Sequence, residues 1–176
     1  MSTADDLIKV VHVIDGLGSA GMEQMVASLV CRLDKKRFDV TLLSELPMKE
    51  SVKNQVAFLE QNQVKVVFLQ KETRRKILVK QYFDYFRSEQ PDIVHSHSGV
   101  WRDSCIGARL AGVKRLYHTE HGRVFLDDNL RARLTHRFLS ALRTRVIAVS
   151  EELETFLNTG VGIPKTKLAT LHNGIN

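Results

Sequence analysis

The sequence predicts an α/β domain with a doubly wound, mainly parallel sheet and helices on both faces. Short apolar runs alternate with helical patterns along the whole chain, as in a series of βαβ units. Most of these runs are mainly apolar rather than strictly alternating with polar residues, which is expected of strands that helices cover on both sides. A glycine-rich turn joins the first apolar run to the first helical pattern, as in many ligand-binding folds of this class.

The apolar runs define the expected strands of this sheet. They cover residues 8–14, 38–44, 64–69, 91–97, 115–122, 145–150 and 167–171. Pro91 stands at the entry of the fourth run, where the ladder needs no backbone N–H donor. We expect these seven strands to form one sheet, with Pro91 at the start of the fourth strand.

The segments between the strands carry helical spacing. Helices are expected over residues 22–33, 51–62, 73–89, 101–112 and 127–142, and from Glu151 onward. Gly112 ends the fourth of these, and Ser150 is a suitable N-cap for the last. The helix expected over 127–142 carries Leu130, Leu134, Phe138, Leu139 and Leu142 on one face.

Three glycines, Gly16, Gly18 and Gly21, follow the first strand directly. Glycine allows close approach of the backbone to a ligand and adopts positive φ at little cost. The start of a helix also presents unpaired N–H groups and a positive dipole end to an anion. The turn therefore has the form of a phosphate cradle, although a tight βα turn without a ligand also favours glycine.

Composition indicates a soluble globular domain, or one half of a two-domain protein. Of 176 residues, 43% are hydrophobic and 26% are charged, and the net charge of +6 suits an anionic partner such as a nucleotide, nucleic acid or acidic lipid. Cys31 and Cys105 lack metal-ligand spacing, so we expect reduced packing residues of a cytosolic protein. Neither a signal peptide nor a membrane-spanning run is apparent. Because the sequence stops in an Asn173-Gly174 turn with no closing helix, we expect the natural protein to continue.

Four of the seven histidines fall near the ends of two neighbouring strands: His95, His97, His118 and His121. Ligands of doubly wound sheets bind at the carboxyl ends of the strands. Core packing could account for His95 and His118, but it explains the whole set poorly. A ligand-binding or catalytic role is therefore expected at this edge.

One functional interpretation is a dinucleotide site. The run GLGSAG fits G-x-G-x-x-G, and Glu45 ends the second strand about where a ribose-binding acid belongs. Glu23 argues against it, because its carboxylate would lie beside the pyrophosphate and repel it.

A second interpretation is a metal site formed by His95, His97, His118 and His121. His95 and His97 share a strand face, whereas His118 and His121 need not, and no aspartate accompanies them.

The third interpretation rests on a resemblance. The segments GSAGMEQ, PDIVHSH, HTEHG, RVIAVSEEL and LHNGIN occur in this order along the chain. Together they resemble the N-terminal domain of family 4 glycosyltransferases, which have the two-domain GT-B architecture. The resemblance runs from about Ile8 to Asn176. Each motif is loose, but five in order make the resemblance specific.

This resemblance implies transfer of a sugar from a nucleotide-diphosphate sugar to an acceptor, with retention of configuration and without a metal or other cofactor. It implies that the glycine loop, Gly18, Ser19, Ala20 and Gly21, approaches the donor diphosphate and the acceptor. The family commonly has two adjacent glycines before the glutamate. This chain instead has Ala20 and Gly21, followed by Met22 and Glu23, which leaves open which amide contributes.

The same resemblance assigns roles at the other strand ends. His121 matches the catalytic histidine that faces the donor sugar, and His97 matches a position near the acceptor. Glu120, Gly122 and Arg123 flank this site. Asn173 lies in the turn where the chain crosses into the second domain of such enzymes.

Residues 1–176 therefore correspond to the acceptor-side domain, and the nucleotide-sugar-binding domain of the architecture is not among them. We expect little or no activity from the fragment, because charge-stabilising groups are divided between the two domains. Bacterial polysaccharide biosynthesis is the implied context. The alternatives are an NAD(P)-binding Rossmann oxidoreductase domain and a non-catalytic nucleotide- or sugar-binding module.

Two basic segments have two explanations. The first contains Lys71, Arg74, Arg75, Lys76 and Lys80; the second contains Arg131, Arg133, Arg137, Arg143 and Arg145. A solvated helix face accounts for both. Alternatively they make a peripheral contact with anionic lipid at the inner face of the cell membrane, which suits a lipid-linked acceptor. Nucleic acid is not an expected partner, because aromatic residues are not interleaved with the basic ones.

Overall fold

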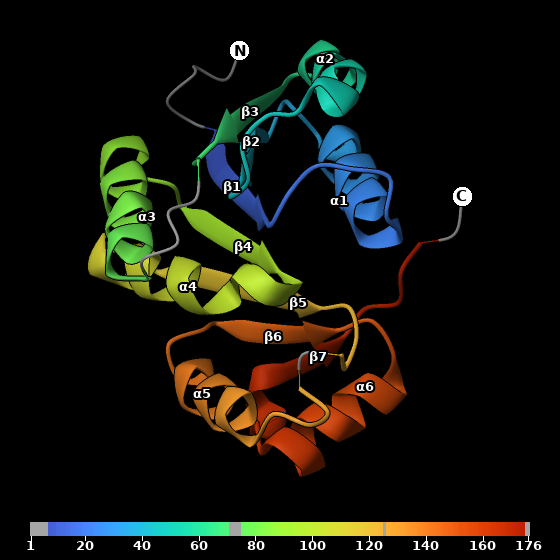
Figure 1. The fold of residues 1–176 in the computed structure, drawn as a ribbon, viewed down its shortest axis with the longest axis vertical. Helices are drawn as coiled ribbons and strands as arrows, with labels where there is room; N and C mark the ends of the chain where they lie inside the picture. Colours follow the sequence, from blue (N-terminus) through green and yellow to red (C-terminus); the bar gives the residue numbers. More distant parts are fainter. Residues whose placement is uncertain (1–6, 71–74, 125, 175–176) are drawn as a thin grey trace.

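The computed structural model describes residues 7–70, 75–124 and 126–174, and residues 75–77 only as backbone. Its centre is one sheet of parallel strands in the order β3-β2-β1-β4-β5-β6-β7 (Figure 1). The strands are β1 (Ile8–Ile14), β2 (Phe38–Ser44), β3 (Val64–Phe68), β4 (Ile93–His97), β5 (Arg115–Glu120), β6 (Arg145–Ala148) and β7 (Leu168–Thr170). The predicted doubly wound α/β fold is confirmed, and every described strand pair is parallel.

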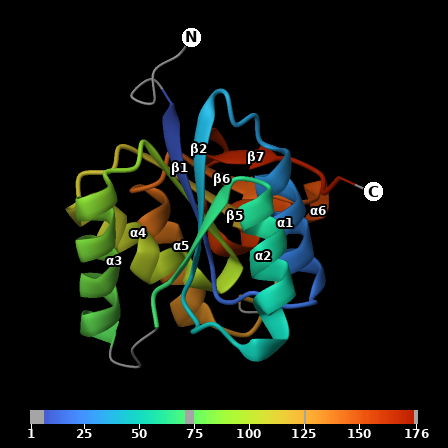
Figure 2. The same ribbon diagram turned by 90° about the horizontal axis from the view of Figure 1, so that it is seen from above.

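Helices cover both faces of this sheet. They are α1 (Gly21–Arg32), α2 (Lys53–Gln61), α3 (Arg75–Glu89), α4 (Trp101–Leu110), α5 (Leu130–Ser140) and α6 (Glu151–Phe156). Figure 2 shows α1 and α2 on one side and α3 and α4 on the other. Gly112 follows α4 with φ of +89°, and Ser150 accepts a hydrogen bond from the Leu153 amide at the start of α6, so both predicted helix boundaries are confirmed.

Alternate residues of each strand face opposite helix layers. Val11 and Val13 of β1 join Tyr82 and Phe86 of α3 in one core cluster, whereas Ile14 packs with α1 and α2 in another. A third cluster joins β6 and β7 to α6 and the segment that follows it. The strands are apolar on both faces because each face is covered, which is the reason their sequence lacks alternation.

Strand order reverses between β1 and β4. The chain runs outward from β1 through β2 to β3, then crosses to β4 and continues to β7. The loops after β1 and β4 therefore diverge, and ligands of such sheets bind in the crevice that this leaves. The glycine loop (residues 15–20) and His97 lie at this point of the fold.

The helix α5 is shorter than predicted, and its apolar face does not pack on the sheet. It spans Leu130–Ser140 rather than 127–142, and its buried residues are His136 and Ser140. Its apolar face is exposed: Leu130 is 70% and Phe138 is 71% accessible. The apolar spacing therefore identified a helix, but the face that packs on the sheet is the polar one.

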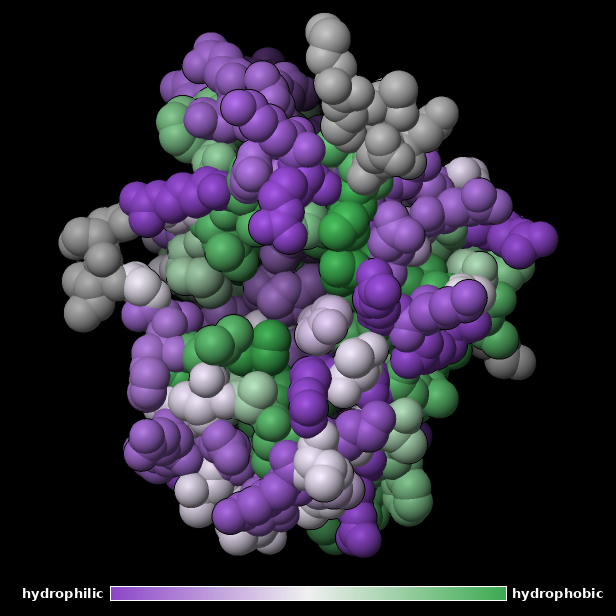
Figure 3. All heavy atoms as spheres, turned by 180° about the vertical axis from the view of Figure 1, so that it is seen from behind, coloured by the Kyte–Doolittle hydropathy of each residue, from purple (hydrophilic) through white to green (hydrophobic). Residues whose placement is uncertain are grey.

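The surface is otherwise mixed. The face opposite to that of Figure 1 carries mostly hydrophilic side chains with smaller apolar areas between them (Figure 3). Among the described residues, no helix combines the length and the apolar character that crossing a bilayer requires. Cys31 and Cys105 are free thiols, as predicted.

Candidate active site

The glycine loop after β1 is closed by its own glutamate. Glu23 folds back from the first turn of α1, and its Oε2 accepts a hydrogen bond of 3.1 Å from the Ala20 amide. A Cβ on Gly18 would lie 2.5 Å from the same oxygen, so a side chain there would displace the end of the Glu23 side chain from this position. Positive φ is not the reason for glycine in this loop, because the described glycines with positive φ are Gly112 and Gly162. Close approach is therefore the reason for glycine at position 18.

Two glutamines fix the same loop. The side-chain amides of Gln24 and Gln55 both donate to the carbonyl of Gly18, at 3.0 and 3.3 Å. The first N–H groups of an α-helix have no partner within the helix. Glu23 binds the Ala20 amide, whereas the amides of Gly21 and Met22 at the start of α1 have no hydrogen-bond acceptor among the described residues, so these two can face a ligand.

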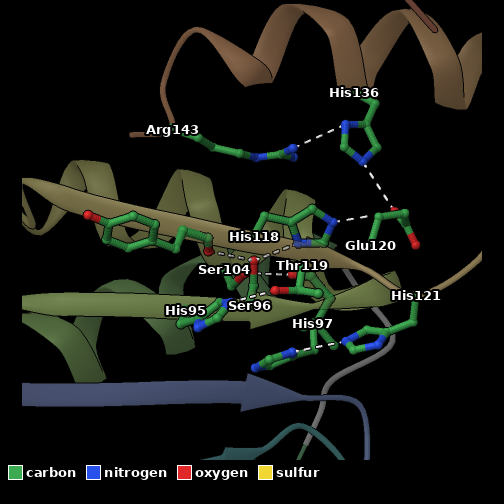
Figure 4. A network of polar contacts seen from close by, with 12 residues as sticks. His95, Ser96, His97, Ser104, His118, Thr119, Glu120, His121, His136 and Arg143 are labelled. Atoms are coloured by element: carbon green, nitrogen blue, oxygen red, sulfur yellow. Dashed lines mark hydrogen bonds and ion pairs between the residues drawn. The ribbon is translucent and has the colours of Figure 1, made fainter. Parts of the chain in front are cut away.

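Three histidines form a chain across β1, β4 and β5. His97 Nε2 lies 3.1 Å from His12 Nδ1, and His97 Nδ1 lies 3.2 Å from His121 Nε2. Figure 4 shows the rings of His97 and His121 meeting at the carboxyl ends of the strands. His95 stacks on His97 with ring centroids 4.4 Å apart, and its Nε2 lies 2.8 Å from Thr119 Oγ1.

Burial keeps these rings neutral. Desolvation, helped by the charge of Lys35, lowers the pKa of His12 to about 4. Burial also lowers the pKa of His97 well below its usual value, with smaller contributions from His95 and the other rings. Burial lowers the pKa of His121 as well, and Glu120 opposes that shift. At neutral pH each ring therefore carries one N–H donor and one acceptor nitrogen.

A second polar network lies on the opposite face of β5. Glu120 Oε2 accepts hydrogen bonds from the Nε2 atoms of His118 and His136, both at 3.3 Å. His118 Nδ1 lies 3.0 Å from Ser96 Oγ. Arg143 Nη1 donates to His136 Nδ1 at 3.1 Å (Figure 4). This network connects α5 to the end of β5, where His121 follows.

The predicted site residues thus divide between two environments. His97 and His121 meet directly, whereas Glu120 turns to the α5 side with only 4% of its surface accessible. Arg123 is exposed; it donates to Asp127 at 2.9 Å and lies over the ring of Phe156. Gly122 has open space where a Cβ would be, and Asn173 lies on an exposed segment after β7.

The four-histidine metal interpretation is not supported by this arrangement. His118 faces Glu120 and His136, whereas His95 and His97 face His12 on the other side of the sheet. The dinucleotide interpretation meets a similar difficulty at Glu45. That side chain is 1% accessible and accepts a hydrogen bond from the Tyr82 hydroxyl at 2.6 Å, so it does not face a ribose site.

Sequence reasoning missed His12, His136 and Arg143. His12 interrupts the apolar run of β1, and a polar residue inside a buried strand was the available signal. Arg143 was placed in a basic segment and His136 was given no role, but both are buried, with 1% and 0% of their surfaces accessible. The prediction that Arg143 belongs to an exposed basic cluster is wrong, because Arg143 stacks over Trp101 at 4.8 Å. Lys71 and Arg74 lie outside the described residues.

Several solved structures share this fold. The Anabaena protein HepE in complex with UDP and glucose superimposes with a TM-score of 0.73 at 15% identity, over 96% of this chain and 45% of that one. A glycosyltransferase from Rickettsia africae superimposes with a TM-score of 0.70 at 15% identity, over 97% of this chain and 44% of that one. A UDP-N-acetylglucosamine 2-epimerase from Rickettsia bellii superimposes with a TM-score of 0.64 at 14% identity, over 95% of this chain and 45% of that one.

The chain is thus a Rossmann-like α/β unit of the type that forms the N-terminal half of GT-B glycosyltransferases. It spans about half the length of the solved structures that it matches. The profile of Glycosyltransferase Family 4 matches residues 19–176, and the chain belongs to that family. Comparison with curated protein sequences gave no match.

Proposed function

We propose that this chain is the acceptor-side half of a retaining, metal-independent glycosyltransferase. The enzyme moves a sugar from a nucleotide-diphosphate sugar to a glycan or lipid-linked acceptor in polysaccharide biosynthesis. The observation that carries this proposal is the convergence of the glycine loop and His121 at one carboxyl edge, in a chain of Glycosyltransferase Family 4. A second domain supplies the nucleotide-binding groups.

The chemistry needs hydrogen-bond donors at this edge. As the glycosidic bond to the diphosphate breaks, negative charge grows on the leaving phosphate and positive charge grows on the sugar ring. Preorganised donors stabilise such charge without reorganising. The amides of Gly21 and Met22 and the positive end of the α1 dipole serve the phosphate, and His121 serves the sugar. Gly18, Ser19 and Ala20 shape the loop around the acceptor.

The other predicted site residues are either buried next to His121 or lie on the segments that follow β5 and β7. His97 is 1% accessible, so its influence on a substrate passes through His121. Glu120 anchors the end of β5 through His118 and His136. In this proposal the second domain approaches Arg123, Gly122 and Asn173, which follow β5 and β7.

The test begins with the reading frame beyond codon 176, expressed as the full natural chain. Purified protein is assayed against uridine-, guanosine- and adenosine-diphosphate sugars with lipid-linked and free glycan acceptors. We expect transfer with retained anomeric configuration by NMR, unchanged by EDTA. His121→Ala should lower turnover by about 100-fold or more, because it removes one transition-state donor. His172→Ala, at an exposed position, is the matched control.

Inversion of configuration, or loss of activity in EDTA, would contradict the proposed mechanism. Binding of nucleotide sugar with no transfer by the full natural chain would instead support a non-catalytic binding module. In this proposal the charge-stabilising groups are divided between two domains, so the 176-residue chain assayed alone should show little or no turnover.

We also propose a cytoplasmic location at the membrane surface, and α4 and α5 supply the face for it. A groove between them, here called the α4/α5 surface, is lined by Arg102, Ile106, Leu130, Arg131, Leu134, Thr135, Phe138 and Leu139. These residues include two arginines and no acid. Exposed apolar side chains flanked by cations suit a bilayer with anionic headgroups.

Vesicle co-sedimentation tests this location. We expect the chain to sediment with vesicles of phosphatidylcholine and 30% phosphatidylglycerol, and much less with phosphatidylcholine alone, because each cation near an anionic surface adds about 1 kcal/mol. Leu130→Ser/Phe138→Ser should release it. Phe58→Ser is the matched control, because Phe58 is 54% accessible on α2, away from this surface. Equal sedimentation with both vesicles, or equal release by the control, would refute the proposal.

A further inference from the structure

Three histidine rings from two neighbouring strands lie together on one face of the sheet. His12 of β1 is the register partner of His95 of β4, and His97 follows two residues later on the same face of β4. One ring nitrogen of each histidine lies within 4.8 Å of a ring nitrogen of each of the other two. The pairing of β1 with β4 therefore brings three potential metal ligands to one point.

The spacing of these nitrogens is close to that of zinc ligands. Zinc binds imidazole nitrogens at about 2.0–2.1 Å, so two ligands of a tetrahedral site lie about 3.3 Å apart. His12 Nδ1 and His97 Nε2 lie 3.1 Å apart. A hydrogen bond would account for this pair, but not for His95, whose ring centre lies 4.9 Å from that of His12 and 4.4 Å from that of His97. A single ion accounts for the convergence of all three rings.

Hydrogen bonds to neighbouring residues orient two of the rings. A histidine that binds a metal through one ring nitrogen is normally held by a partner at the other nitrogen. His97 directs its Nε2 to His12, and its Nδ1 lies 3.2 Å from His121 Nε2. The ring of His95 is held by Thr119, whose Oγ1 lies 2.8 Å from His95 Nε2. The sheet thus holds the ligands in place before an ion binds.

A second cluster on the opposite face of β5 does not have the character of a metal site. Ligand atoms of His118, Glu120 and His136 also lie within 4.8 Å of one another. Both histidines, however, direct Nε2 to the carboxylate of Glu120, and the guanidinium of Arg143 lies 3.1 Å from His136 Nδ1. Because this buried guanidinium already balances the carboxylate and would repel a cation, close spacing of ligand atoms is not sufficient there.

We propose that His12, His95 and His97 bind one Zn²⁺ ion, with a water molecule at the fourth position. Imidazole binds zinc in its neutral form, which burial favours for these rings. His12 and His97 are 3% and 1% accessible, whereas His95 is half-buried, so the ion enters past His95. The ion joins β1 to β4 at the point where strand order reverses.

This ion is structural, and the inference goes beyond the proposed function, whose chemistry uses no metal. His97 lies between His12 and His121, so the ion is separated from the residue that serves the sugar. We expect a brief treatment with EDTA to leave the ion in place, because two of its ligands are almost fully buried. The insensitivity of transfer to EDTA that the proposed mechanism requires is therefore compatible with this site.

Metal analysis of the 176-residue chain tests the site directly. The chain is expressed with zinc in the medium and freed of loosely bound metal by a brief EDTA wash. We expect one zinc ion per chain, and we expect the visible absorption of four-coordinate Co²⁺ when cobalt replaces zinc in the medium. A chain that retains neither metal, or that holds cobalt in six-coordinate form, would overturn the proposal.

NMR spectra of ¹⁵N-labelled histidine identify the ligands in the unmodified chain. Spectra of chains expressed with and without zinc should differ most at His12, His95 and His97, with a smaller change at His121, which contacts His97. Changes confined to other histidines would show that zinc binds elsewhere and would overturn the proposal. This measurement decides the ligand set even where a variant is unstable.

Variants separate this site from other arrangements of histidines. His95→Gln removes a ligand at a half-buried position and should abolish zinc retention while circular dichroism shows a folded chain. His121→Gln keeps the three ligands and should retain zinc. His172→Gln, at an exposed position, controls for zinc held by surface histidines and should also retain it. Retention by His95→Gln, or equal loss from His121→Gln, would overturn the proposed ligand set.

Thermal unfolding measures the structural role of the ion. Free zinc at about 100-fold above its dissociation constant should raise the Tm of the zinc-free chain by about 5–10 °C, because the ion binds only the folded state. The Tm of His95→Gln should not rise, and an equal rise in both chains would overturn the role. Transfer by the full natural enzyme is a separate measurement. Absence of transfer with zinc retained would refute the proposed function alone, whereas transfer by a chain without zinc would refute this site alone.

Discussion

The guanidinium carbon of Arg143 lies 4.8 Å from the centre of the Trp101 ring, and the arginine is almost fully buried beneath α4 and α5. Its Nη1 donates to His136, which in turn donates to Glu120. Nε and Nη2 have no hydrogen-bond partner among the described residues. A buried cation is thus paired with a buried carboxylate through one imidazole, next to β5, the strand that His121 follows.

Replacing Arg143 should destabilise the fold strongly. Arg143→Leu leaves Glu120 buried without its counter-charge, which typically costs about 3–5 kcal/mol. Urea unfolding followed by circular dichroism measures this cost. Arg131→Leu, at an exposed position of α5, should change the unfolding free energy by less than about 0.5 kcal/mol. Equal effects of the two variants would show that the buried pair contributes no net stability.

Acid should unfold the domain through its buried histidines. The unfolded chain takes up protons near pH 6.5, whereas the folded chain does so only near pH 4 at His12 and near pH 3 at His136. Stability from these groups is therefore complete above pH 6.5 and falls as the pH drops toward 4. Each such histidine contributes a slope of about 1.4 kcal/mol per pH unit.

Unfolding free energies at pH 7.5, 6, 5 and 4.5 measure that slope. His12→Phe should reduce the slope by about 1.4 kcal/mol per pH unit, the contribution of one proton, because it removes a group that is neutral only in the folded chain. His172→Gln, at an exposed site, should leave the slope unchanged. A flat pH profile between 7.5 and 4.5 would contradict the buried, neutral state of these rings.

The close approach of Gly18 and Glu23 predicts a coupled effect. Gly18→Ala should displace the Glu23 carboxylate from the Ala20 amide and cost about 1 kcal/mol, the usual value of a helix cap. Glu23→Ala should cost about as much. The double variant should cost no more than Glu23→Ala alone, because the clash is gone. Additive losses in thermal unfolding would show that the two residues act independently.

Gly107 is the contact point of α3 and α4. A Cβ there would lie 2.5 Å from Tyr82 Cβ and 3.0 Å from the Phe83 amide nitrogen, so the helices would have to separate. Gly107→Ala should cost about 1–3 kcal/mol by overpacking. Gly21→Ala is the control, because its Cβ meets nothing within 4 Å. Denaturant unfolding compares them, and equal midpoints would refute the close packing.

Periodicity and composition were sufficient for the fold. The run from Ile8 to Ile14 is apolar except at Lys9 and His12, and that pattern follows from burial on both faces of a parallel sheet. Gly112 and Ser150 marked helix ends correctly because capping depends on local backbone geometry. These features involve neighbours in sequence, and so the sequence alone predicts them.

Periodicity and composition could not predict which side chains contact one another across the sheet. The spacing of His95, His97, His118 and His121 indicated a site, but not that His12 would join His97 while His118 joined Glu120 on the opposite face. The apolar face of α5 was found by its period, yet its exposure depends on how the helix docks. Arg143 looked like a surface cation because the sequence gives no sign of Trp101 covering it.

The sequence by itself determined the doubly wound sheet, the glycine loop at its first turn and the family resemblance carried by the motifs around them. Only the tertiary structure decided which imidazole nitrogens face one another, which face of β5 holds Glu120, and which side of α5 meets solvent. The physical reason is that strand and helix patterns record burial residue by residue. Hydrogen-bond partners from β1, β4, β5 and α5 are chosen only when the sheet brings distant segments into register.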